Sequence, residues 1–141
     1  MAGLTDDQIN LVKANWAAVK PIKETAADLF YNKLFELDPK TRDLFKEDIS
    51  IQKKALMATI SFAVATLNHP DKLVPAVQDL GKRHGKYGVT AAHYGTVAQA
   101  LLWTLEQGLA DAWTPEAKAA WTEVYTILST TMIEAAAEDA A

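Results

Sequence analysis

The sequence of 141 residues contains no cysteine. This absence excludes disulfide bonds and every zinc or iron site that needs a thiolate ligand. No apolar run approaches the ~20 residues of a membrane-spanning helix, although half of the residues are hydrophobic. The N-terminus begins Met-Ala-Gly-Leu-Thr-Asp-Asp, without the basic start and apolar block of a secretory signal. We therefore expect a cytoplasmic protein that does not bind a membrane.

Basic residues are also in short supply. The 14 Lys and Arg residues are outnumbered by 18 Asp and Glu residues, and the formal net charge is −4. Nonspecific nucleic-acid binding requires a basic face, so we expect no nucleic-acid partner. The length suits one domain with one continuous core, spanning residues 1–141.

Helix signals occur throughout the chain. Apolar residues recur every three or four positions, and no strand-like alternation interrupts them. Residues that favour helix starts precede the apolar stripes: Thr5 with Gln8, Pro21, Asp38–Pro39, Ser50, Thr90 and Thr114–Pro115. Residues that favour helix ends follow them: Asn68 to Asp71, Gly85, Gly88 and Gly108. The pattern predicts an all-α fold of about seven to eight helices, two of them short, with a tail after Ile133 that frays.

Polar side chains interrupt the apolar stripes at three positions. His84 stands where a fourth apolar residue should follow Leu73, Val77 and Leu80. Gln52 lies one turn before an inward Leu56, and Tyr31 lies in a helix whose inner face is otherwise Leu and Phe. A buried polar group without a partner costs roughly 1–3 kcal/mol. We therefore expect these three side chains to meet a bound group.

Each of these residues also has a plain structural interpretation. His84 alone would be a core or capping histidine, Gln52 a surface residue, and Tyr31 a core residue whose hydroxyl bonds to a carbonyl. Tyr94, on an inner stripe, is usually interpreted as packing.

The spacing of the histidines limits the metal chemistry. Neither His69 nor His93 lies three or four residues from His84, as a two-histidine site on one helix requires. A lone imidazole instead suits haem iron, because the porphyrin supplies the equatorial ligands and the protein needs to supply only one axial nitrogen. Apolar side chains from several helices are available to cover a flat disc: Phe45, Leu56, Ile60, Leu80, Val89, Val97 and Leu101. On the opposite side, Tyr31 and Gln52 would donate hydrogen bonds to a polarised dioxygen ligand.

The chain resembles the globin family over nearly its whole length, in particular single-domain bacterial globins related to the haem domain of flavohaemoglobins. The matching segments are Phe30-Tyr31 with Leu34-Phe35, Pro39 six residues before Phe45, Gln52 with Leu56, the Lys-Arg-His84-Gly-Lys-Tyr-Gly-Val segment, His93-Tyr94, and Ala-Ala-Trp121-Thr-Glu-Val-Tyr125.

The resemblance implies a haem b cofactor (iron protoporphyrin IX) with His84 as proximal iron ligand. It implies Phe45 stacked on the haem, and Tyr31, Gln52 and Leu56 in the distal pocket. Further contacts to the cofactor are expected from Ile60, Leu80, Val89, Tyr94 and Val97.

Two departures from the flavohaemoglobin pattern concern the iron's electron supply. In those proteins a tyrosine and a glutamate are linked to the proximal histidine. Tyr94 matches the tyrosine, but the glutamate's place is Ala136, and Glu134 lies roughly 200° around a helix from it. The second departure is that the sequence ends at residue 141, so we expect no flavin or nicotinamide domain.

Four functions are compatible with this pattern. The first is binding of dioxygen, nitric oxide or carbon monoxide at the iron, with oxygen transport as one use. The second is conversion of nitric oxide to nitrate with a separate reductase. Gas sensing requires an output element for which the chain has little room, and a haemless interaction module would not need His84, Gln52 and Tyr31 together. We expect dioxygen binding, with nitric oxide dioxygenation as the alternative.

Overall fold

The computed structural model describes residues 4–44 and 49–140, and every regular element in these two ranges is helical. The six α-helices are α1 (Asp6–Val19), α2 (Lys23–Leu37), α3 (Ile49–Ala65), α4 (Pro70–Lys86), α5 (Ala91–Leu109) and α6 (Pro115–Ala140). Three short 3₁₀ segments connect them: η1 (Lys20–Ile22), η2 (Pro39–Leu44) and η3 (Ala110–Ala112). The all-α prediction is confirmed, with six rather than seven or eight α-helices over the described residues.

Local capping explains most of the helix starts. Thr5 and Gln8 form the predicted capping box, each side chain accepting from the other's backbone N–H at 3.1 Å. Thr90 caps α5, and His93 completes a second box by accepting from the Thr90 N–H at 2.9 Å. Thr114 Oγ1 accepts from the Ala117 N–H at the start of α6. These bonds satisfy backbone donors that a helix N-terminus would otherwise leave unpaired.

Two predicted starts were wrong. Pro21 lies inside η1, and α2 begins only at Lys23. Ile22, the last residue of η1, is 40% exposed. Ser50 lies within α3, which already includes Ile49, so it does not cap that helix.

Two predicted ends also differ. Gly85 lies inside α4, which continues to Lys86, while Gly88 takes the left-handed conformation (φ +88°) that favours glycine after a helix. The tail after Ile133 does not fray, because α6 continues to Ala140 and buries Ala135.

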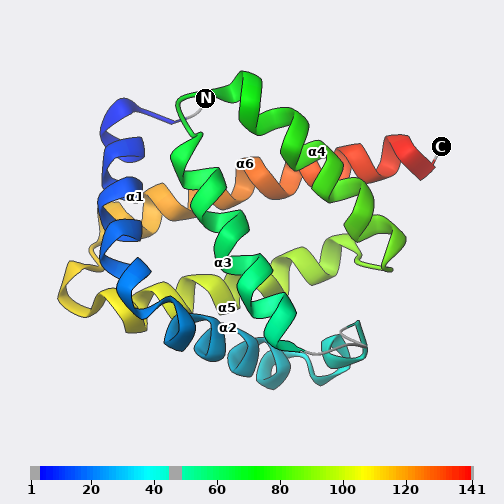
Figure 1. Cartoon of the computed structure of the whole chain (residues 1–141), viewed down its shortest axis with the longest axis horizontal. Coiled ribbons are helices and arrows are strands. Elements are labelled where there is room, and N and C mark those ends of the chain that lie inside the picture. Colours follow the sequence, from blue (N-terminus) through cyan, green and yellow to red (C-terminus); the bar gives the residue numbers. More distant parts are fainter. Residues whose placement is uncertain (1–3, 45–48, 141) are drawn as a thin grey trace.

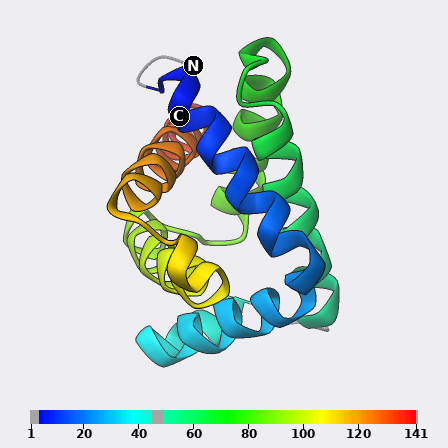
Figure 2. The same cartoon turned by 90° about the vertical axis from the view of Figure 1, so that its left-hand side faces the viewer.

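The helices cross one another at steep angles (Figure 1). Helix α4 packs closely on α6, α2 packs on α5 and α3, and α1 packs on α6, α3 and α5. Between α3, α4 and α5, by contrast, the described residues make at most a few close backbone contacts. Viewed from the side, the ribbons of these helices lie around a central region (Figure 2). The side chains that fill the space between their backbones therefore come from all three of the helices that carry most of the candidate residues.

The core is divided into two clusters of buried residues. The larger surrounds Trp16 and Trp121, whose ring centroids lie 6.3 Å apart. The smaller consists of Phe30, Tyr31, Leu34 and Ala100. Partly buried Leu56 and Leu101 pack against both clusters. The boundary between the clusters thus lies at residues predicted to line the site.

No helix among the described residues has both the length and the apolar character needed to cross a membrane.

Candidate functional site

His84 lies in the last turn of α4 and is half-buried. Its Nδ1 atom lies 2.8 Å from the Leu80 carbonyl oxygen. Since a carbonyl can only accept a hydrogen bond, Nδ1 carries the proton and the lone pair is on Nε2. Burial lowers the pKa of His84 below its usual value. The hydrogen bond to Leu80 opposes this shift in part, and the Arg83 charge lowers the pKa by a smaller amount. The neutral imidazole with Nε2 as its electron-pair donor is the form that binds a metal ion.

The position of His84 is determined by close packing of α4 on α6. A Cβ added at Gly81 would lie 2.4 Å from the Met132 carbonyl oxygen, and one at Gly85 would lie 3.0 Å from the Ala136 Cβ. At Gly81 the backbone of α6 therefore approaches within a distance that only glycine permits, and at Gly85 the Ala136 side chain leaves little space for a larger residue. His84 lies between these glycines in the sequence, so the α4–α6 contact fixes the segment that carries it.

The apolar residues predicted to line the site share an intermediate burial. They come from α3 (Leu56, Ile60), α4 (Leu80), the following turn (Val89) and α5 (Val97, Leu101), and all are partly exposed. Each packs against at least one core cluster. Apolar side chains with one face packed and one face open can bury further area against a flat apolar group, at ~25 cal/mol per Å². Phe45, the remaining predicted contact, lies outside the described residues.

Tyr31 and Gln52 are brought together by the packing of α2 on α3. Tyr31 is buried, and its hydroxyl donates to the main-chain carbonyl of Gln52 at 3.3 Å. This distance is long for an O–H···O hydrogen bond. The Tyr31 ring contacts Phe30 edge-on, with centroids 5.0 Å apart, and lies 6.0 Å from the Phe35 ring. Gln52 itself is half-buried at the start of α3.

Burial also changes the acidity of Tyr31, raising its pKa from 10.0 to about 12. A group whose folded-state pKa exceeds its unfolded value contributes stability that is complete below the unfolded pKa and is lost as the pH rises through the folded one. We expect the free energy of unfolding to fall between pH 10 and about 12, with Tyr31 contributing up to ~1.4 kcal/mol per pH unit. Urea titrations of the chain and of Tyr31→Phe across this range measure the effect. The variant should show the shallower slope, and parallel slopes would contradict the assignment.

Tyr94, predicted as a cofactor contact or as packing, is 9% exposed in α5. Its hydroxyl is the buried side-chain polar atom for which no partner is found among the described residues. Tyr125 from α6 donates its hydroxyl to the Tyr94 main-chain carbonyl at 2.7 Å, which ties α6 to the start of α5. Burial raises the pKa values of both tyrosines.

Ala136 occupies the position that corresponds to the glutamate of the flavohaemoglobin pattern. Ala136 faces Gly85, the residue after His84, while Glu134 is exposed. A carboxylate at position 136 would thus lie beside the histidine segment, and this chain has a methyl group there. The unpaired Tyr94 hydroxyl agrees with the missing acceptor.

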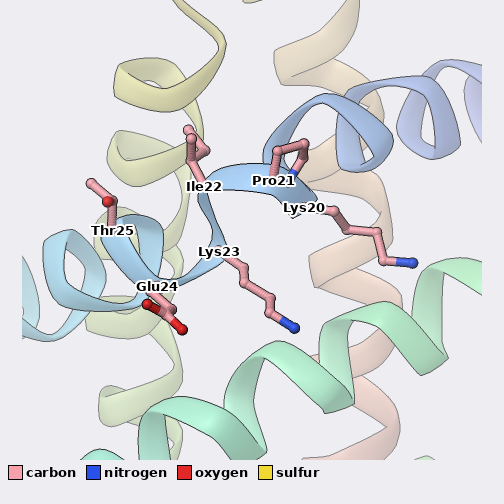
Figure 3. A pocket seen from close by; sticks show the side chains of 6 residues that line it. All are labelled: Lys20, Pro21, Ile22, Lys23, Glu24 and Thr25. Carbon is pink, nitrogen blue, oxygen red and sulfur yellow. The ribbon is translucent and has the colours of Figure 1, made fainter.

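A separate surface pocket of about 300 Å³ lies at the corner between α1 and α2. Figure 3 shows its lining, which is one consecutive run: Lys20, Pro21, Ile22, Lys23, Glu24 and Thr25. It contains none of the residues predicted from the sequence to form the site. The pocket is the hollow of a single turn, and we assign it no function.

Helices crossing at steep angles around a half-buried histidine, with a tyrosine and a glutamine on other helices, define the globin fold. The family described as Globin matches residues 28–132, and the chain belongs to this family. The fold is shared with an engineered carbene transferase made from a putative nitric oxide dioxygenase of Rhodothermus marinus, at a TM-score of 0.85 and 26% identity over 96% of this chain and 94% of that one. A hexacoordinated haem protein from an anhydrobiotic tardigrade has the same TM-score of 0.85 at 21% identity, with 96% of each chain covered.

Relatives identified by sequence include flavohemoproteins and proteins named anaerobic nitrite reductase. Flavohemoproteins of Bacillus subtilis and Rhodopirellula baltica are 26% and 30% identical over 92% and 89% of this chain. The chain spans about a third of their length (33% and 32%). A protein named anaerobic nitrite reductase NSHB5, from Oryza sativa subsp. indica, is 27% identical over 94% of this chain and 95% of its own length.

Proposed function

We propose that this globin binds haem b through His84 and uses it to bind dioxygen reversibly. The observation that carries the proposal is the hydrogen bond from His84 Nδ1 to the Leu80 carbonyl, which leaves Nε2 as the electron-pair donor. Membership of the globin family implies a haem cofactor. Haem supplies a ferrous iron to which small diatomic gases bind.

The chain's own residues fit this group. The half-exposed apolar side chains of α3, α4 and α5 offer an apolar surface for the porphyrin faces, and the described backbones of these three helices make few close contacts with one another. Arranged on the distal side, Tyr31 and Gln52 would each donate a hydrogen bond to the gas. Tyr31 stays protonated at neutral pH because its pKa is about 12, so it acts as a donor and not as an anionic ligand.

Tyr31→Phe is expected to release dioxygen about tenfold faster, because one lost hydrogen bond is worth ~1.4 kcal/mol. Replacing Gln52 by alanine should have a smaller effect, since its longer side chain is more mobile. Stopped-flow dissociation from the ferrous protein measures both. Tyr87→Phe is the control for loss of a tyrosine hydroxyl: Tyr87 is 65% exposed, and phenylalanine keeps the ring that lies 6.3 Å from the His84 ring, so the rate should not change. An unchanged off-rate in Tyr31→Phe would remove this residue from the mechanism.

The same donors could also serve nitric oxide dioxygenation with a separate reductase. Relatives named flavohemoprotein, and the neighbour titled a putative nitric oxide dioxygenase, favour this alternative. The alanine at position 136 and the unpaired Tyr94 hydroxyl argue against it, because no carboxylate is placed to increase the basicity of His84. Nitric oxide consumption limited to one equivalent per haem, in the presence of a reductase, would leave only gas binding.

Absorption spectra of the ferric, ferrous and dioxygen-treated protein test the proposal most directly. We expect a strong band near about 400 nm, one histidine ligand and a reversible change with dioxygen. A purified protein that takes up no haem when mixed with hemin would overturn the proposal.

A further inference from the structure

The exposed side of helix α3 is mostly apolar. Its inner side carries apolar residues of the core, and its outer side carries a second apolar set that is exposed to solvent: Ile51, Ala55, Ala58, Phe62 and Ala65. The exposed polar residues of this helix are Ser50, Lys54 and Thr59. Within the apolar set the two large side chains are 59% exposed (Ile51) and 43% exposed (Phe62). An apolar stripe along a helix is normally buried against another element. The outer face of α3 therefore lacks a covering surface.

The spacing of the outer residues is regular. Steps of four, three, four and three residues lead from Ile51 to Ala65. This is the heptad spacing that places apolar side chains in one straight seam and allows two helices to pack at about 20°. Figure 1 shows α3 crossing in front of α5 and α6, with no described helix drawn over it. All five residues of the seam are exposed to solvent.

The seam is complementary to itself when two copies run in opposite directions. An antiparallel pair centred on Ala58 places Ile51 of one copy opposite Ala65 of the other. It also places Phe62 of one copy opposite Lys54 and beside Ala55 of the other, and the two Ala58 residues opposite each other at the axis. Each large apolar side chain then has a small apolar one next to it, which is the arrangement that interdigitating helices require, and the Lys54 stem can lie along the Phe62 ring.

The charges on α3 favour the same arrangement. Its charged residues are Lys53 and Lys54, both near its N-terminus, where a positive charge opposes the helix dipole. Lys53 is paired with Asp28 of α2 at 2.7 Å, whereas Lys54 is exposed beside the seam. In an antiparallel pair, Lys54 would approach the C-terminal end of the other copy's α3, where a positive charge is stabilising.

We propose that the outer face of α3 binds a second copy of this chain, through a two-fold symmetric, antiparallel contact centred on Ala58. Such a contact repeats the same patch on both copies. The 17 residues of α3 are about 25 Å long. One helix face of this length is smaller than the ~800 Å² per partner of a standard interface, so the dimer should be weak, with a dissociation constant of roughly 10–1,000 μM.

Sedimentation velocity of the haem-loaded protein, from about 5 μM to about 1 mM, tests the pairing by mass action. The mean mass should rise toward that of a dimer with concentration. Ala58→Glu and Ala58→Lys should each weaken association at least tenfold, because each places two like charges at the symmetry axis. An equimolar mixture of the two variants should associate again, because the charges are then opposite. Ala119→Glu on α6, also exposed, is the matched control and should leave association unchanged.

Circular dichroism must show that both Ala58 variants keep the helical content of the unaltered chain. A chain that stays monomeric at about 1 mM would overturn the proposal and leave the face to another occupant. Dimers that tolerate both substitutions would overturn it as well. Failure of the mixed variants to associate, with the unaltered chain dimeric, would contradict the contact centred on Ala58.

Discussion

His84→Ala is expected to abolish axial coordination of the haem iron by the protein. The loss of haem affinity should exceed the roughly 10–100-fold that follows removal of an outer-shell partner of a metal ligand, because the ligand itself is lost. The apolar contacts from α3, α4 and α5 should still retain some cofactor, since burial of the porphyrin does not depend on the iron–nitrogen bond. Absorption spectra and the rate of haem transfer to an acceptor protein measure the two effects separately.

Free imidazole should restore the coordination spectrum of His84→Ala, because it can occupy the volume left by the side chain. His69→Ala is the matched control. His69 is exposed at the start of the same helix and its side chain makes no capping bond, so neither spectrum nor transfer rate should change. If His84→Ala kept the spectrum of the unaltered protein, His84 would not be the iron ligand.

Gly81→Ala is expected to lower the free energy of unfolding by about 3 kcal/mol. The added Cβ would lie 2.4 Å from the Met132 carbonyl oxygen and 2.5 Å from the Met132 Cα, and backbone atoms cannot rotate away as a side chain can. The intrinsic helix preference for alanine over glycine, about 1 kcal/mol, is too small to offset this overlap. Urea denaturation measures the difference.

Gly95→Ala is the opposite case on another helix. An added Cβ there meets nothing within 4 Å, so stability should increase by roughly 0.5–1 kcal/mol. The two alanine substitutions therefore differ in sign, although both replace a glycine inside an α-helix. A stable Gly81→Ala variant would show that α4 can move away from α6 at little cost.

The sequence predicted the parts of this fold that depend on neighbouring residues. The capping boxes at Thr5 and Thr90 are formed by residues three positions apart, so their signal is local. Gly85 was interpreted as a helix end because glycine often is one. Its actual role is to admit Ala136, which lies 51 positions later and belongs to a different helix. No local pattern could reveal that contact.

For the site, too, the sequence predicts local patterns but not the contacts between distant segments. The three polar exceptions were recognisable because each interrupts an apolar stripe, and the structure brings Tyr31 against the first turn of α3 that carries Gln52. That the Tyr31 hydroxyl donates to the main-chain carbonyl of that turn depends on how α2 crosses α3, which the sequence pattern does not specify. The bond from Tyr125 to the Tyr94 carbonyl likewise joins distant segments and was not predicted.

The contact of Gly81 and Gly85 with α6 has a mechanical consequence for gas binding. Main-chain atoms have no alternative rotamers, so the contact between α4 and α6 is stiff. The segment of α4 that carries His84 therefore keeps its position relative to α6. Helix α3 packs on α1 and α2, and none of these three helices contains a glycine that would admit a main-chain contact of this kind, so we expect α3 to be the more compliant wall. Any displacement that an arriving gas molecule imposes should therefore be taken up by α3, and an isotope-exchange experiment with and without carbon monoxide should show its largest change in residues 49–65 rather than in α4.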